Sequence, residues 1–400
     1  MRFRHPDGTV LHVSYGTNVH PAQDVDGLVD QLRRFAGPVR RRLGADRLGL
    51  GLWLPAEATH RLAADPSAVG LLRKALEHEG LEVVTVNAFP YGNFHAPVVK
   101  KAVYRPDWTQ DARLDYTLDC AQVLTELLPD DVARGSISTL PLGWREPWDA
   151  TRSAAARDRL DRLADGLGVL EDRTGRTVRV AFEPEPGCLA ETATGLADHL
   201  RGVDTDRLGA CVDLCHLATE FEEPTAALAA LRGAGLPVVK TQVSAALHCE
   251  DPRDPAALEA LEEFAEARFL HQVRERHVTG SAGTGGTAVE RRDDLPDALG
   301  RVDGTPGLPG DGPWRVHVHV PLHATPRPPL RSTRDVLTDA LDLLVGGPHP
   351  VVDHLETETY TWSVLPAHLR PRDDDGLVAG IAAELAWTRG QLVDRGMGAL

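Results

Sequence analysis

The sequence predicts an α/β fold in which eight parallel strands close into a (β/α)8 TIM barrel. Short apolar runs alternate with amphipathic helical patterns along almost the whole chain, as expected of repeated βα units. Two apolar runs end abruptly in acidic or imidazole side chains, as buried parallel strands do at the carboxyl end of a barrel. A length of 400 residues with 42% hydrophobic residues suits one large barrel that carries an insertion.

Composition excludes several classes of function. A formal net charge of −16 argues against a nucleic-acid partner, which requires a basic surface. We expect no membrane insertion, because no stretch approaches about 18 uncharged apolar residues, and the N-terminus does not resemble a secretory signal. The five scattered cysteines predict no disulfide framework. We therefore expect a cytoplasmic protein, and we interpret Cys211 and Cys215 as small buried residues.

The eight strands are assigned from the apolar runs in chain order. They are residues 10–15, 48–54, 81–89, 134–140, 177–183, 208–213, 237–243 and 350–356. An open doubly wound sheet would give the same alternation. It would normally have a glycine-rich phosphate turn after the first strand, and residues 14–18, Ser-Tyr-Gly-Thr-Asn, do not form one.

Helical patterns fill the intervals between the strands. They are residues 25–42, 67–79, 109–128, 150–173, 192–201, 224–232, 255–269, 333–344 and 375–395. The helix at 67–79 shows the clearest boundary signals: Asp65 and Ser67 offer an N-terminal cap, and Gly80 follows as a stop before the next strand.

One region interrupts this alternation. Residues 279–312 are rich in Gly, Thr, Asp and Pro and predict a long excursion or mobile loop. Residues 314–320 alternate strictly between apolar and polar, which predicts either an extra strand or a barrel strand that displaces one assigned above. We interpret the chain as a single barrel domain, 1–400, with an insertion at about 250–331 after the seventh strand.

Polar residues gather where the predicted strands end, which is the functional face of this architecture. They are Asn18, His20, Asn87, Glu183, Glu185, Asp213, His216, Gln242, Glu356 and Glu358. Oxygen ligands from several strands, without a set of thiolates, suit Mg²⁺ or Mn²⁺, and Co²⁺ or Zn²⁺ are also compatible. We predict one divalent ion and leave open a further one.

The predicted ligands are two glutamates, one aspartate and one amide. They are Glu183, Asp213, Gln242 and Glu356. Glu185 and Glu358 are alternatives, because each lies two residues beyond a chosen glutamate. His317 and His319 share one face of a predicted strand, so a metal site at this pair also stays open.

The segments 182–187, Phe-Glu-Pro-Glu-Pro-Gly, and 211–216, Cys-Val-Asp-Leu-Cys-His, resemble the xylose-isomerase-like TIM barrels, which include sugar isomerases, epimerases and endonuclease IV-type enzymes. The resemblance implies a single metal held by the four predicted ligands. It also implies that His216, in Asp213-x-x-His216, contacts the substrate or a second metal. It covers most of the chain, but only these two motifs are specific.

A narrower resemblance is to the EboE-type metabolite traffic proteins. It is carried by the segments 15–21, Tyr-Gly-Thr-Asn-Val-His-Pro, 182–187 and 354–362, His-Leu-Glu-Thr-Glu-Thr-Tyr-Thr-Trp. This resemblance implies a role in the biosynthesis or export of a small metabolite, with other proteins of the same pathway as partners. The insertion at 250–331 departs from the epimerase pattern.

The functional hypothesis is isomerisation or epimerisation of a small hydroxycarbonyl or sugar-like metabolite. Glu183 and Glu356 would be the acid–base pair, and His216 would hold a substrate hydroxyl. The predicted substrate-binding residues are Asn18, His20, Asn87 and His95. The alternatives are a non-catalytic metal-dependent carrier and an endonuclease IV-like phosphodiesterase. Homo-oligomerisation is left open.

Overall fold

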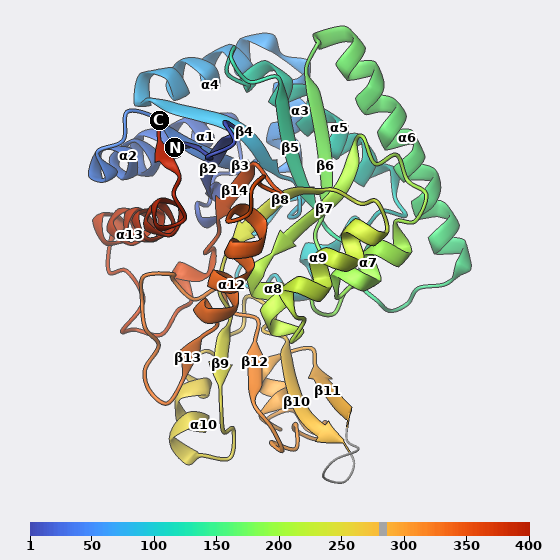
Figure 1. Ribbon diagram of the computed structural model, residues 1–400, viewed down its shortest axis with the longest axis vertical. Helices are drawn as coiled ribbons and strands as arrows, with labels where there is room; N and C mark the ends of the chain where they lie inside the picture. The colour runs from blue at the N-terminus through green and yellow to red at the C-terminus, as the bar shows by residue number, and fades with distance from the viewer. Residues whose placement is uncertain (280–285) are drawn as a thin grey trace.

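The computed structural model describes residues 1–279 and 286–400 and contains a closed barrel of parallel strands (Figure 1). The barrel strands follow one another in chain order: β2 (Val10–Gly16), β3 (Leu48–Trp53), β4 (Leu81–Asn87), β5 (Arg134–Thr139), β6 (Thr177–Phe182), β7 (Leu208–Asp213), β8 (Val238–Val243) and β14 (His354–Thr357). The sheet closes because β14 pairs in parallel with both β8 and β2. The predicted (β/α)8 barrel is confirmed.

Burial on both faces explains why these strands are almost continuously apolar. Every residue of β3, β4, β7 and β8 is buried. A parallel barrel is covered inside by its own side chains and outside by helices, so neither face of a strand needs to be polar. A polar residue inside such a strand therefore has to be satisfied by a specific partner.

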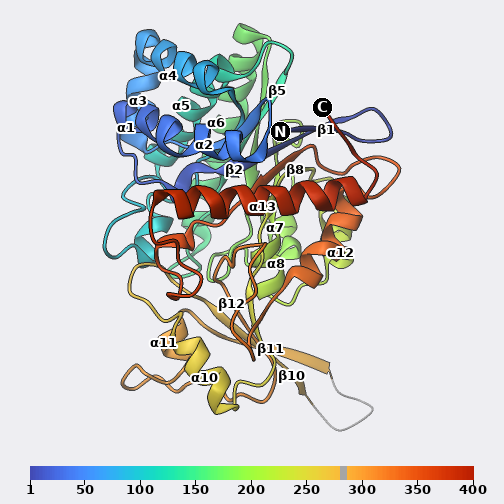
Figure 2. The same ribbon diagram turned by 90° about the vertical axis from the view of Figure 1, so that its left-hand side faces the viewer.

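Helices surround the barrel (Figures 1 and 2). They are α1 (Val25–Gln31), α2 (Gly37–Leu43), α3 (Ala56–Ala64), α4 (Pro66–Glu79), α5 (Asp111–Leu127), α6 (Ala150–Thr174), α7 (Ala193–His199), α8 (Leu214–Thr219), α9 (Pro224–Gly233), α12 (Arg334–Val345) and α13 (Asp374–Asp394). None of the helices in the described ranges is both long enough and apolar enough to cross a membrane.

The two ends of the chain lie together beside β2. The short strand β1 (Arg2–Arg4) pairs antiparallel with both β2 and β15 (Gly398–Ala399). Figure 1 shows both termini on this side of the barrel.

Some element boundaries differ from the prediction. The helix expected over 25–42 consists of α1, a π-helical segment η2 (Leu32–Ala36) and α2. Two helices around the barrel were missed: α3, and α8, which is only six residues long and begins directly at the Asp213 cap. The helix expected over 255–269 is wrong in its second half, because α10 (Pro255–Glu262) ends before Phe264 and the chain continues as turns and bends.

The insertion forms a second, antiparallel sheet below the barrel in Figure 1. Its strands run in the order β11 (Gly286–Arg292), β10 (Val273–Thr279), β12 (Trp314–Val316), β9 (Leu247–Cys249) and β13 (Arg331–Ser332). The expectation of one long loop over 279–312 is therefore wrong for β11 and α11 (Leu295–Ala298), while residues 280–285 lie outside the described part of the chain.

The alternating segment at 314–320 is an extra strand and displaces no barrel strand. Only Trp314–Val316 pairs in the second sheet, and the next residues run back to the barrel. There the Val320 N–H donates to the Ala245 carbonyl (2.9 Å), just beyond the end of β8. This return path carries His317 and His319 to the carboxyl end of the barrel.

Candidate metal centre

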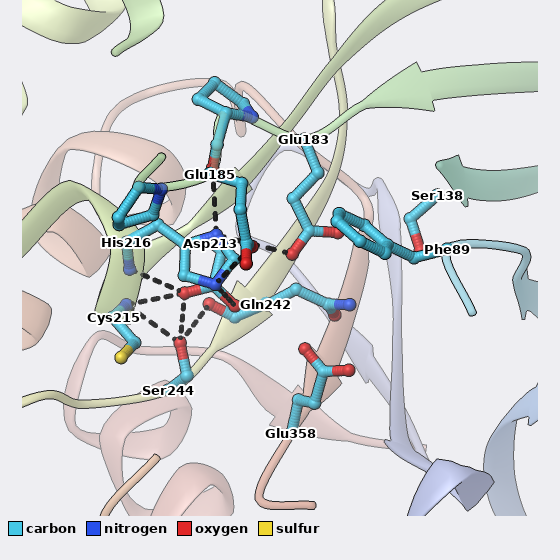
Figure 3. A network of polar contacts seen from close by, with 12 residues as sticks. Phe89, Ser138, Glu183, Glu185, Asp213, Cys215, His216, Gln242, Ser244 and Glu358 are labelled. Atoms are coloured by element: carbon cyan, nitrogen blue, oxygen red, sulfur yellow. Dashed lines mark hydrogen bonds and ion pairs between the residues drawn. The ribbon is translucent and has the colours of Figure 1, made fainter. Parts of the chain in front are cut away.

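Three carboxylates from different parts of the chain converge at the mouth of the barrel. Glu183 follows β6, Asp213 ends β7 and Glu358 follows β14. One oxygen of each lies within 4.8 Å of the others, and all three residues are buried. Figure 3 shows Glu183 and Glu358 approaching the Asp213 region from different strands.

The two oxygens of the Asp213 carboxylate have different roles, one in the fold and one in the group of three carboxylates. Oδ1 accepts hydrogen bonds from the backbone N–H of Cys215 (2.7 Å) and of His216 (2.9 Å), and from the Ser244 hydroxyl (2.8 Å). This fixes the carboxylate at the N-terminus of α8. Oδ2 is buried and has no hydrogen-bond partner among residues 1–279 and 286–400, and the same holds for Glu183 Oε2. Buried oxygens without partners are uncommon and require an explanation.

The electrostatics of the carboxylate group explain these buried oxygens without partners. Burial raises the pKa of Glu183 well above its ordinary value, and the nearby carboxylates of Glu358 and Asp213 raise it further. The pKa of Glu358 is raised in the same way, by burial first and then by Asp213 and Glu356. Carboxylates crowded in a buried space oppose one another's ionisation. A divalent cation would remove this repulsion, so the donor set and its charge fit a metal ion.

Glu356, a predicted ligand and acid–base residue, lies elsewhere. Its Oε2 pairs with the Lys240 ammonium (3.1 Å), and both side chains are completely buried. Residues two apart on a strand share a face but lie roughly 7 Å apart along it, so Glu358 reaches the mouth while Glu356 stays deeper in the barrel. The structure thus brings Glu358, the alternative, into the carboxylate group in place of Glu356.

Gln242, the predicted amide ligand, lies at the end of β8. Its Nε2 donates to Glu356 Oε1 (3.3 Å), and its Oε1 is buried without a partner. In the view of Figure 3 its side chain extends between Glu183 and Glu358.

Three buried imidazoles lie around the carboxylates, and each has its Nδ1 directed at a carbonyl oxygen. Nδ1 of His216 lies 2.8 Å from the Pro184 carbonyl, that of His317 lies 2.8 Å from Gln272 Oε1, and that of His319 lies 2.7 Å from the Glu358 carbonyl. Because carbonyl oxygens only accept hydrogen bonds, each Nδ1 carries a proton, and Nε2 has a free lone pair when the ring is neutral.

These Nε2 atoms meet each other and the carboxylates. His319 Nε2 lies 3.8 Å from Asp213 Oδ2 and has no hydrogen-bond partner. His216 Nε2 lies 3.1 Å from His317 Nε2 and 3.1 Å from Glu185 Oε2. Two lone pairs at this distance repel one another, so a proton or a cation has to lie between His216 and His317.

Three further groups of potential ligands therefore adjoin the carboxylates. They are Asp213, His216 and His319; Glu185, His216 and His317; and Cys215, His317 and His319.

The predicted substrate-binding residues separate into two pairs. Asn18 and Asn87 line the cavity at the barrel mouth, and each donates its amide Nδ2 to Glu358 Oε1, at 2.8 and 3.0 Å. His20 instead stacks on Phe35 at 4.3 Å between ring centroids, and burial lowers its pKa to about 3. His95 Nε2 contacts the Asn18 carbonyl at 2.8 Å. Neither histidine is among the described residues that line this cavity.

Several groups that hold the site were not predicted from the sequence. Tyr104 donates its hydroxyl to Glu185 Oε1 (2.8 Å), and Gln272 donates Nε2 to Tyr104 (3.0 Å). Lys240, the cation beneath the carboxylates, also donates to the Ser138 hydroxyl (3.1 Å). Tyr104 ends the short 3-10 helix η3 (Lys100–Tyr104) and Gln272 lies just before β10, and the local pattern of neither segment gives a sign of a role. A lysine inside the apolar strand β8 was a detectable sign, because a buried lysine requires a charged partner.

Comparison with solved structures finds similar folds at low identity. A D-allulose 3-epimerase from Methylomonas sp. in complex with D-allulose is 14% identical, covers 97% of this chain and 100% of its own, and has a TM-score of 0.47. A xylose isomerase-like TIM barrel protein from Mycobacterium smegmatis in complex with magnesium is 12% identical over 94% and 98%, with a TM-score of 0.45. A 3-keto-D-glucoside 4-epimerase from E. coli is 15% identical over 58% and 79%, with a TM-score of 0.39.

Comparison with curated proteins gave no match. Residues 41–285 match the family model described as the xylose isomerase-like TIM barrel, which is more than half of the chain. The matched range contains Glu183 and Asp213 with the strands that carry them. The chain therefore belongs to the xylose isomerase-like TIM barrel family.

Proposed function

We propose that this protein is a divalent-metal-dependent isomerase or epimerase that acts on a small hydroxycarbonyl or sugar-like metabolite. The observation that carries the proposal is the meeting of Glu183, Asp213 and Glu358 at the barrel mouth, with His319 Nε2 3.8 Å from Asp213 Oδ2. Three of these four residues have a buried polar atom without a partner in the described part of the chain. Such atoms are costly unless a ligand satisfies them.

These four residues would hold the ion. They combine three carboxylates with one imidazole, a donor set that suits Mn²⁺, Zn²⁺ or Co²⁺ better than Mg²⁺, which prefers oxygen ligands and keeps several waters. When bound, the ion supplies a Lewis acid that polarises the substrate carbonyl. His319 takes the place that sequence analysis gave to Gln242, and Glu358 takes that of Glu356.

The protein's own groups would move the proton. In this proposal the Glu183 carboxylate removes a proton from the carbon beside the carbonyl, and Glu358, starting in its protonated form, donates its own proton to that carbon. Exchange with solvent then returns both residues to their starting states. Asn18 and Asn87 orient Glu358 through hydrogen bonds to its Oε1. His216, whose Nδ1 is held by the Pro184 carbonyl, presents Nε2 to a substrate hydroxyl or to a further cation.

The second group of ligands, Glu185, His216 and His317, is the place for that further cation. A bound cation would end the repulsion between the two Nε2 atoms that lie 3.1 Å apart. The number of ions is measured by titrating metal-free protein with Zn²⁺ and counting equivalents.

The narrower proposal concerns the role in the cell. The motifs at 15–21, 182–187 and 354–362 resemble the EboE-type metabolite traffic proteins. They support a place in the production or export of a metabolite, and a carrier that keeps the site without turnover is the alternative. Exchange of solvent deuterium into candidate ketoses separates the two, because only an enzyme labels the carbon beside the carbonyl.

The central test compares the metal content of the purified protein with that of the Glu183→Gln variant. We expect stoichiometric Mn²⁺ or Zn²⁺ in the wild type and loss of most of it in the variant, because the amide removes an anionic ligand. Glu82→Gln is the matched control: Glu82 is also buried, but it is paired with Arg2 (2.8 Å) away from the site, and metal content should not change. Unchanged metal in Glu183→Gln would refute the proposed centre.

A further inference from the structure

We infer, on the basis of the proposed function, that the substrate is an uncharged, unphosphorylated hydroxycarbonyl compound whose far end is apolar. The cavity at the barrel mouth carries this inference, because its lining combines two kinds of chemistry. The polar part of the lining consists of three carboxylates, three imidazoles and two amides: Glu183, Glu185, Glu358, His216, His317, His319, Asn18 and Asn87. This part matches hydroxyl and carbonyl oxygens.

The apolar part of the lining includes an aromatic wall. We define it as Phe94, Val99, Val103, Phe269, Leu270 and Tyr360, all of which line the cavity. Ring centroids lie 5.1 Å apart for Phe94 and Phe269, 5.3 Å for Phe94 and Tyr360, and 5.1 Å for Phe269 and Tyr360. These rings belong to a hydrophobic cluster separate from the main barrel core.

The aromatic wall joins three segments that are distant in the sequence. Phe94 comes from the loop after β4, Phe269 from the segment between α10 and β10, and Tyr360 from the chain after β14. The first two are tied by backbone hydrogen bonds from the N–H groups of Val99 (2.7 Å) and Lys100 (2.9 Å) to the Arg268 carbonyl. The wall is thus a built part of the cavity, and it favours a carbon-rich group on the ligand.

No free cation is available for a phosphate. Among the described residues, Lys100 is the one lysine or arginine that lines the cavity. Its Nζ already contacts Asp294 Oδ2 (2.5 Å) and the carbonyls of Phe269 (2.6 Å) and Glu266 (3.2 Å). A phosphate dianion here would lose its hydration, find no free lysine or arginine in the described lining, and compete with the carboxylates for the proposed metal ion.

The test uses three sugars that differ at one carbon: 6-deoxy-D-fructose, D-fructose and D-fructose 6-phosphate. Their binding to the metal-loaded protein is measured by isothermal titration calorimetry. We expect the 6-deoxy sugar to bind several-fold more tightly than D-fructose, and the phosphate to bind at least about tenfold more weakly. Equal or tighter binding of the phosphate would overturn the inference, as would failure of all three sugars to bind.

Two variants show whether the aromatic wall is the cause. Phe269→Ala should abolish the preference for the 6-deoxy sugar, and Leu270→Arg should raise the affinity for the 6-phosphate by adding an unpaired guanidinium. If neither variant alters the order of affinities, the wall does not select the substrate.

The metal titration on the same preparations separates this inference from the proposed function. Absence of metal binding contradicts the proposed function, whereas a preference for the phosphate in metal-loaded protein contradicts only the inference.

Discussion

At the scale of single residues, the site depends on how each polar side chain divides its atoms between the fold and the ligand. Asp213 satisfies the N-terminus of α8 with Oδ1 and leaves Oδ2 free. His319 uses Nδ1 to contact the Glu358 carbonyl and leaves Nε2 free. Orientation of a ligand by its second atom is typical of metal sites in proteins.

His319 gives a direct prediction. His319→Ala should lower the affinity for Zn²⁺ by at least roughly tenfold, because it removes a ligand that the carboxylates cannot replace. Competition with a fluorescent zinc chelator measures this. The control is His323→Ala, four residues further on, where the ring stacks on Trp362 at 6.1 Å and lies outside the metal-ligand groups. Equal affinities in the two variants would exclude His319 as a ligand.

Glu384 predicts a pH dependence of stability away from the ligands. Burial raises its pKa to about 7 from 4.5, even though Oε1 accepts hydrogen bonds from Thr359 Oγ1 (2.6 Å) and from the Leu322 N–H (2.9 Å). Between these two values the folded state binds more protons at this residue than the unfolded state. The free energy of unfolding should therefore fall as the pH rises through this window, by no more than roughly 3 kcal/mol.

Glu384→Gln isolates this contribution. The amide oxygen keeps both hydrogen bonds, and the residue stays neutral at every pH. Urea unfolding at about pH 5 and pH 8 should show a smaller loss of stability in the variant than in the wild type. A parallel loss in both proteins would show that Glu384 does not titrate in this range.

At the scale of elements, the barrel strands are shaped by what lies inside them. Gly51 in β3 faces the Glu356 carboxylate so closely that a Cβ would overlap it. The glycine leaves room for the buried pair between Lys240 and Glu356, whose atoms lie 3.1 Å apart. A glycine in a strand often marks such a close approach.

Two glycine substitutions should have opposite effects. Gly51→Ala should lower the free energy of unfolding by roughly 1–3 kcal/mol or more, because the new Cβ would displace a carboxylate that is completely buried and paired with Lys240. Gly70→Ala, inside α4 with no atom within 4 Å of the new Cβ, should raise it by about 0.5–1 kcal/mol. Chemical denaturation measures both, and a neutral Gly51→Ala would mean that β3 or Glu356 relaxes.

At the scale of the whole molecule, the centre ties together distant parts of the chain. Glu183 and Asp213 come from consecutive strands, His319 from the return path of the insertion, and Glu358 from the last barrel strand. The unfolded chain does not assemble these residues, so the ion should bind the native state alone.

Metal binding should therefore raise the melting temperature. At a free Mn²⁺ or Zn²⁺ concentration of about 100 times Kd, linkage gives roughly 2.7 kcal/mol of added stability. Differential scanning calorimetry of chelator-treated protein, with and without added metal, measures the shift. The Asp213→Asn variant should show no metal-dependent rise in melting temperature. A rise equal to that of the wild type would show that the ion binds elsewhere.

The local sequence pattern was sufficient to predict the barrel and part of the candidate site. Apolar runs ending at Glu183 and Asp213 predicted that both residues lie at the carboxyl ends of neighbouring strands. This was possible because the local pattern of apolar residues indicates where a buried strand begins and ends. The choice between Glu356 and Glu358 was not predictable, since both lie on one face of the same strand. It depends on which carboxylate Lys240 neutralises, and that contact crosses the barrel.

The sequence by itself determined that the chain builds a parallel barrel and that acidic residues end two adjacent strands. Only the tertiary structure decided that the insertion forms a second sheet and returns His317 and His319 to the barrel mouth. The physical reason is that hydrophobic periodicity acts over a few residues. The relative positions of the proposed metal ligands, in contrast, are set by packing between segments more than a hundred residues apart, such as those that carry Glu183 and His319.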